Sequence, residues 1–376
     1  MVTNPFILYG YESEKYFCDR KAETAELKRL VENGNNVALI APRRIGKTGL
    51  IENLFHRKDI SNHYYTFLVD IYATKNIEEM VLALSTSMLA SLRPRGAKVM
   101  QQFVSLLPSL RTGVSFDAMG NPSWNLEVGN IKQPRTTLDE IFRYIGEAGR
   151  PCIVAIDEFQ TVSTYSDTST EALLRTYIQH CRNAQFIFSG SQRTMMGEIF
   201  NSPSRPFYQS SSTMNLGCIP VDEYTKFAQG HFAGAGKCLA AETAALVYQR
   251  FEGVTWYVQR VMNELFSLTG PGEDCTPDMV DIAIGNILRA NEFTYQSTLF
   301  QLPPKQKELL IAICKEVKAK NLTSSSFIHK YQLPGSSSVQ SAIKGLLEKN
   351  FLTVTLGVYE VYDKFFAIWL SSMHQQ

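Results

Sequence analysis

Eight consecutive residues have the types and spacing of a phosphate-binding loop. They are Ala41-Pro42-Arg43-Arg44-Ile45-Gly46-Lys47-Thr48, which fit the pattern G-x-x-x-x-G-K-[ST] except that Ala41 replaces the first glycine. Gly46 lets the backbone approach phosphate oxygens, and Lys47 adds a positive charge on the outer phosphates. Thr48 supplies a hydroxyl for magnesium. We predict that residues 41–49, ending at Gly49, bind ATP; the alternative is a chance turn with a solvated basic run.

Two adjacent carboxylates follow the most apolar strand of the chain, at Asp157 and Glu158. Ligands bind in the crevice at the carboxyl ends of such strands. Asp157 can therefore hold Mg²⁺, directly or through water, and Glu158 can orient or activate a water for attack on the γ-phosphate. The alternative is a helix N-terminus whose acidic residues satisfy the dipole, but the upstream loop favours the magnesium site.

Other polar residues near these motifs give weaker candidates. Ser189, with Ser191 as second choice, ends another apolar strand and could contact the γ-phosphate or the attacking water, although a polar turn explains it equally well. Arg205 could reach a phosphate in cis or from a neighbouring subunit, but such arginines more often form ion pairs. Arg43 and Arg44 are expected to point away from the nucleotide and to pack around the loop.

Strands and helices alternate around these motifs. A strand over 37–40 precedes the loop and a helix over 47–56 follows it, as a phosphate-binding loop requires. Further strands are predicted over 64–72, 152–156 and 185–188, and further helices over 22–32, 77–92, 136–148 and 170–181. This order predicts the α/β class, a P-loop NTPase parallel sheet with helices on both faces.

The remainder of the chain changes character twice. Helical patterns without strand signals run from residue 221 to about 300, which predicts a helical lid domain. Three helices and a two-stranded hairpin joined through Leu356-Gly357 then have the outline of a winged helix-turn-helix. We predict domains over 1–217, 218–300 and 301–376. A hairpin inserted at about 110–129 is either a partner-binding element or a surface decoration.

The composition is that of a globular protein, with 376 residues, 44% hydrophobic and 19% charged. The net charge of +1 provides no bulk field to recruit nucleic acid or membrane. Residues 301–376 hold nine lysines against five acidic residues, a local excess of four, so the rest of the chain has a net charge of about −3. Seven cysteines without CxxC spacing indicate free thiols. Without a signal peptide or bilayer-spanning run, we expect a cytoplasmic protein with no membrane partner.

The motifs resemble those of the archaeal-type ATPases, a family of AAA-like P-loop proteins close to the STAND group. The paired arginines before Gly46 and the Asp157-Glu158-Phe159-Gln160 segment match that family. Phe17, Arg20 and Glu23 match its N-terminal box, F-x-x-R-x-x-E, which lies near the adenine. The resemblance therefore implies that Asp19 and Arg20 bind nucleotide.

The resemblance extends to the C-terminal half. Gly253 lies where the family has Gly-x-Pro at the start of a lid helix, with Thr255 in place of the proline. The segment from Asp363 to Trp369 is similar to the one that closes the winged helix. Membership implies an ATP-driven conformational switch and leaves the biological target undefined.

Three functions compete. The first is an ATPase switch, with ATP and Mg²⁺ closing the lid and hydrolysis reopening it. The second is a nucleotide-regulated DNA-binding protein. Its recognition helix offers Gln340, Lys344 and Lys349 but no arginine, so phosphate contact is easier to support than base reading, and a protein-docking role is also open. The third is a non-hydrolysing scaffold, against which the intact motifs argue. The oligomeric state stays open.

Overall fold

The computed structural model describes residues 4–92, 97–109, 114–116, 122–124 and 133–373. The chain divides into two compact units. The sheet unit comprises residues 7–224 and 254–256, and the helical unit comprises the chain up to Phe6, 225–253 and 257 onward. The helical region and the winged helix, which we predict as separate domains, both belong to the helical unit.

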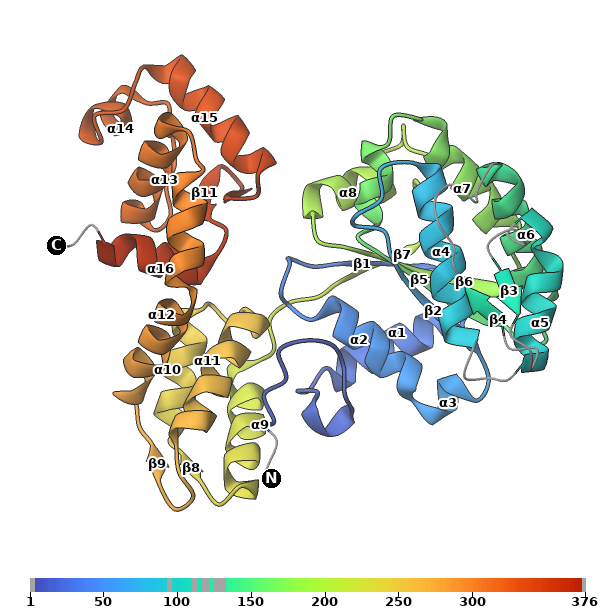
Figure 1. Ribbon diagram of the computed structural model, residues 1–376, viewed down its shortest axis with the longest axis horizontal. Helices are drawn as coiled ribbons and strands as arrows, with labels where there is room; N and C mark the ends of the chain where they lie inside the picture. The colour runs from blue at the N-terminus through green and yellow to red at the C-terminus, as the bar shows by residue number, and fades with distance from the viewer. Residues whose placement is uncertain (1–3, 93–96, 110–113, 117–121, 125–132, 374–376) are drawn as a thin grey trace. The chain divides into compact units, whose positions relative to one another are not determined.

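Five parallel strands form the sheet, in the order β2-β5-β6-β1-β7 (Figure 1). Their bounds are Val37–Ile40 (β1), Tyr65–Asp70 (β2), Cys152–Asp157 (β5), Ala184–Gly190 (β6) and Ser212–Asn215 (β7). Because all pairs are parallel, the carboxyl ends of the strands meet at one edge of the sheet. The prediction of a parallel α/β sheet is confirmed, with β7 as an additional strand.

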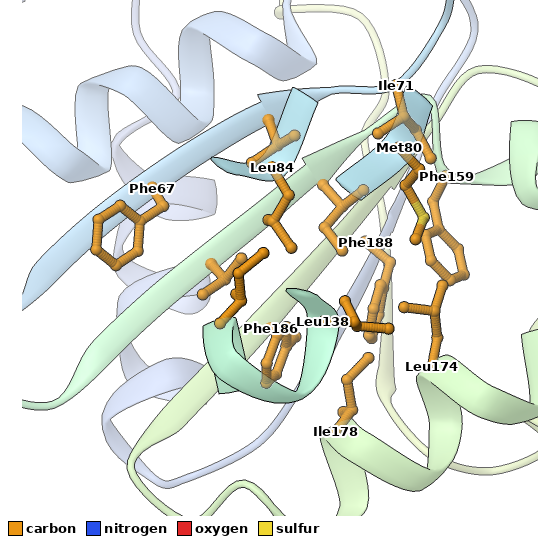
Figure 2. Close-up of a cluster of buried hydrophobic side chains, with 14 of the residues drawn as sticks. Phe67, Ile71, Met80, Leu84, Leu138, Phe159, Leu174, Ile178, Phe186 and Phe188 are labelled. Atoms are coloured by element: carbon orange, nitrogen blue, oxygen red, sulfur yellow. The ribbon is translucent and has the colours of Figure 1, made fainter. Parts of the chain in front are cut away.

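Helices cover both faces of this sheet, because successive strand residues point to opposite sides. Val37 and Leu39 face one core, which is closed by α1, α2 and α3. Ala38 and Ile40 face the other core, which is closed by α4 to α8 and is shown in Figure 2. The helices are Lys21–Glu32 (α1), Lys47–His56 (α2), Lys58–Ser61 (α3), Ile77–Leu92 (α4), Ala97–Leu106 (α5), Pro134–Glu147 (α6), Ser169–His180 (α7) and Arg193–Asn201 (α8).

The predicted inserted hairpin is present as two short strands. Val114–Phe116 (β3) pairs antiparallel with Pro122–Trp124 (β4), while the predicted turn between them lies outside the described residues. Just before the hairpin, the backbone N–H of Ser109 donates to the buried carboxylate of Glu140 at 3.2 Å. This bond anchors the start of the insertion to α6.

The helical unit begins with four helices, in agreement with the predicted helical region. They are Val221–Gly234 (α9), Ala241–Arg250 (α10), Thr255–Leu268 (α11) and Met279–Phe300 (α12), with the two-residue strands Cys238–Leu239 (β8) and Asp274–Cys275 (β9) between them. The first residues of α9 and α11 belong to the sheet unit, so these helices connect the two units covalently. Within the described residues, no helix has both the length and the apolar character that a bilayer crossing demands.

A winged helix closes the chain. It consists of Pro304–Glu316 (α13), Ser325–Lys330 (α14), Ser336–Glu348 (α15), the antiparallel pair Leu352–Thr355 (β10) and Val358–Val361 (β11), and Lys364–Met373 (α16). Ser324 caps α14, since its hydroxyl accepts from the N–H of Phe327 at 3.3 Å. Gly357, at a φ of 76°, makes the tight turn of the wing.

Candidate nucleotide site

The predicted phosphate-binding loop joins β1 to α2. Gly46 has a φ of 98°, in the left-handed region that favours glycine, and it begins α2 as the N-cap residue. Lys47 is only 6% exposed, and its Nζ donates to the carbonyl of Ala41 at 3.4 Å, across the loop. Burial lowers the pKa of Lys47, while the carboxylates of Glu158 and Asp157 oppose that shift. The lysine thus lies within the loop, close to the acidic pair.

Thr48 and Asp157 meet at the carboxyl edge of the sheet. The Thr48 hydroxyl donates to Asp157 Oδ2 at 2.7 Å, although 109 residues separate them in the chain. Asp157 ends β5, and its Oδ1 accepts from the N–H of Glu158 at 3.0 Å. A hydroxyl and a carboxylate are the hard oxygen donors that Mg²⁺ prefers, so this pair fits a magnesium ion.

Glu158 stands in a network at the end of β5. Its backbone is left-handed, with a φ of 55°, a conformation that is uncommon for a residue other than glycine. Its Oε2 accepts from Ser191 Oγ at 2.6 Å and from Gln160 Nε2. Ser189, by contrast, is 0% exposed, and its hydroxyl has no hydrogen-bond partner in the described part of the chain. The geometry favours Ser191, our second candidate, over Ser189.

The two loop arginines contact different protein groups. Arg43 Nε donates to Ser191 Oγ at 3.3 Å, and its guanidinium lies 5.2 Å from the centre of the Tyr72 ring. Arg44 has a φ of 68°, and its guanidinium lies 4.4 Å from the centre of the Trp256 ring. The expected packing role around the loop agrees with these contacts.

Arg20 supports the loop from behind. It is 1% exposed, and its guanidinium donates to the carbonyls of Ile45 at 3.2 Å and Gly217 at 2.7 Å. It also pairs with Glu23 at 2.8 Å. These bonds occupy the guanidinium with protein groups on the loop, at Gly217 and at Glu23.

Asp19 and Phe17 line a cavity of about 420 Å³ next to α1 and α2. Asp19 shares the left-handed backbone of Arg20, with a φ of 50°. The Phe17 ring lies against Gly49, where an added Cβ would be 3.2 Å from a ring carbon. The Phe17 ring therefore contacts the first turn of α2 and also lines this cavity.

Arg205 forms an ion pair away from these contacts. Its guanidinium bonds to Glu171 at 2.6 Å and approaches Glu198 at 3.6 Å. Burial raises the pKa of Glu171, and Arg205 opposes that shift. This geometry favours an ion-pairing role for Arg205 over a contact with a phosphate in cis.

A third carboxylate, Asp70, lies at the same edge of the sheet and is not part of either sequence motif. It ends β2 directly beside Asp157 in the parallel register. Partial burial raises the pKa of Asp70, and the nearby carboxylates of Asp157 and Glu158 raise it further. The backbone N–H of Tyr72 donates to Asp70 at 2.8 Å and opposes this shift. The sequence signal that could have identified Asp70 is its position as an acidic residue near the end of a predicted strand.

Residues 17–261 match the family model described as "ATPase domain predominantly from Archaea". The chain belongs to this ATPase family. Residues 293–372 match the model of a probable winged helix domain, in agreement with the three helices and the wing. No curated protein matches the chain in sequence.

Several solved structures share the fold of this ATPase. The Walker-type ATPase PABY2304 of Pyrococcus abyssi is 17% identical with a TM-score of 0.63, covering 97% of this chain and 99% of that one. The Aeropyrum pernix ORC2 protein, in ADPNP–ADP complexes, is 12% identical with a TM-score of 0.60, covering 98% and 96%. The Aeropyrum pernix ORC1 protein in complex with DNA is 13% identical with a TM-score of 0.51, covering 96% and 93%.

Proposed function

We propose that this protein hydrolyses ATP with Mg²⁺ as a conformational switch that moves the helical lid and the winged helix. Membership of the ATPase family supports ATP binding and hydrolysis in general. The observation that carries the proposal is the meeting of Lys47, Thr48, Asp157 and Glu158 at one edge of the sheet. A phosphate-binding loop and a paired carboxylate are the parts that phosphoryl transfer to water needs.

Each residue has a role that follows from its position. The backbone N–H groups of the loop and of the start of α2 bind phosphate oxygens, with Lys47 on the outer phosphates. Thr48 and Asp157 hold the magnesium ion, which neutralises charge on the phosphates. Glu158 orients the attacking water, and Ser191 lies beside it for contact with the γ-phosphate. The base is placed near Phe17, whose ring lies against Gly49 in the first turn of α2.

The start of α11 supplies a physical route from the loop to the helical unit. The Thr255 hydroxyl donates to the carbonyl of Ile45 at 3.2 Å, and the N–H of Trp256 donates to the carbonyl of Arg44 at 3.0 Å. From Tyr257 onward α11 belongs to the helical unit. A change in the loop backbone on ATP binding is therefore transmitted to the helix that continues into that unit.

This switch predicts different solution shapes with and without ATP. In small-angle X-ray scattering, Glu158→Gln saturated with ATP and Mg²⁺ should give a different distance distribution from the nucleotide-free protein. Trp256→Ala, added to this variant, should bind ATP but show a smaller change, because the Arg44 contact is lost. Leu246→Ala, on the exposed surface of α10, is the matched control and should behave like the parent. Superimposable curves for the free and ATP-bound proteins would exclude the switch.

The winged helix supports a second candidate, contact with the phosphate backbone of DNA. Residues 301–376 carry a lysine excess of four, and Lys344 on α15 is 80% exposed. Without an arginine on α15, base reading has little support, since bidentate contacts to guanine usually come from arginine. A protein-docking role is the alternative for the same domain.

Salt dependence separates these two roles. If the winged helix makes about three phosphate contacts, affinity for duplex DNA should fall about 40-fold between about 50 and 200 mM salt. Lys344→Ala should lower the salt slope by about one, whereas Lys28→Ala, on α1 of the sheet unit, should not. Fluorescence anisotropy with a labelled duplex measures both. Absence of binding at low salt would leave protein docking as the role.

A further inference from the structure

Gln160 is a buried polar residue that the proposed roles leave unused. It lies in the short 3₁₀ helix Phe159–Thr164 (η5), two residues after Glu158, and is 2% exposed. Its Nε2 donates to Glu158 Oε2. Its Oε1 is buried and accepts no hydrogen bond in the described part of the chain. Burying an amide oxygen without a hydrogen bond costs free energy, so the placement of this side chain calls for an explanation.

The Gln160 side chain packs closely against Gly190. Gly190, at the end of β6, faces it, and an added Cβ there would be 2.6 Å from Gln160 Oε1 and 2.3 Å from Met196 Sδ. Both distances are shorter than real Cβ contacts. The absence of a side chain at Gly190 therefore permits the observed placement of the amide against Glu158.

Both donors to Glu158 converge on one oxygen. Gln160 and Ser191 donate to Oε2, while Oε1 has no hydrogen bond within the described residues. With Oε2 held by these two donors, Oε1 is the oxygen left to accept a hydrogen bond from the attacking water. Ser191 Oγ also accepts from Arg43, which links this arrangement to the phosphate-binding loop.

We propose that Gln160 is a positioning residue for Glu158, holding Oε2 so that Oε1 faces the attacking water. The proposal rests on the proposed function, in which Glu158 orients that water. Gln160 itself touches neither the nucleotide nor the water. Its effect is on turnover and passes entirely through Glu158.

Gln160→Met tests this role, because methionine keeps the length of the side chain and removes the donor. We expect kcat to fall about 10- to 100-fold, as for a misplaced catalytic group. The Kd for ATP and the Tm should stay close to those of the wild type. In a Glu158→Gln background, Gln160→Met should cause no further loss, because the two changes act on one group.

Three results would overturn the inference: unchanged kcat, increased kcat, or an equal loss in the Glu158→Gln background. A crystal structure of Gln160→Met gives a readout that does not depend on turnover. A Glu158 carboxylate that is displaced or disordered supports the inference, and an unmoved one contradicts it. Absence of turnover in the wild type would instead count against the proposed function, which keeps the two failures distinct.

Discussion

Glu158→Gln is expected to bind ATP with wild-type affinity and to lose about 100-fold or more in kcat. The amide keeps the size of the side chain but cannot take a proton, and it presents a different set of hydrogen-bonding groups to water. Initial rates of phosphate release at saturating ATP and Mg²⁺ give kcat, and equilibrium titration gives the Kd.

The matched control for this variant is Glu52→Gln, on the nearby helix α2. Burial raises the pKa of Glu52, with Asp157 adding to the shift and His56 opposing it, so it shares the acidic surroundings. No role in turnover is proposed for Glu52. If Glu158→Gln retains full activity, or if both variants lose it equally, Glu158 is not the water-orienting residue.

Lys47→Ala should weaken ATP binding by about 10- to 100-fold, because a charge-assisted contact to phosphate contributes about 1.5–3 kcal/mol. Burial lowers the lysine's pKa in the free protein, and the anionic phosphates of ATP favour its charged form. Isothermal titration with ATP and Mg²⁺ measures the loss.

Lys58→Ala provides the comparison for Lys47→Ala, since it removes a lysine from α3 in the same unit. It should leave the affinity for ATP unchanged. Urea unfolding of both variants checks that any loss of binding does not arise from unfolding. Wild-type affinity in a folded Lys47→Ala protein would contradict the assignment of the loop.

The parallel sheet was largely predictable because its central strands are short apolar runs that both cores bury. The edge strand β7 was not, because only Met214 of its four residues is buried and the segment shows no apolar run. The short helix α8 follows β6 without an N-cap hydrogen bond, and α16 follows the wing directly. Tertiary packing, rather than local sequence, determines these elements.

The motifs predicted the residues that the structure brings together at the candidate site, but not the partners that orient them. Thr48 and Asp157 were recognisable from their motifs, while their 2.7 Å contact depends on the strand order. The burial of Arg20 beneath the loop, and the choice of Ser191 over Ser189, depend on packing between segments far apart in sequence. A single sequence carries no direct record of such contacts.

The most direct test of the account is phosphate release from ATP by the wild-type protein, measured with Mg²⁺ and after its removal by a chelator. We predict steady release with Mg²⁺ and its loss on chelation, because Thr48 and Asp157 would then hold no ion. Tight ATP binding without release, with Mg²⁺ present and with or without duplex DNA, would contradict the proposed hydrolytic function.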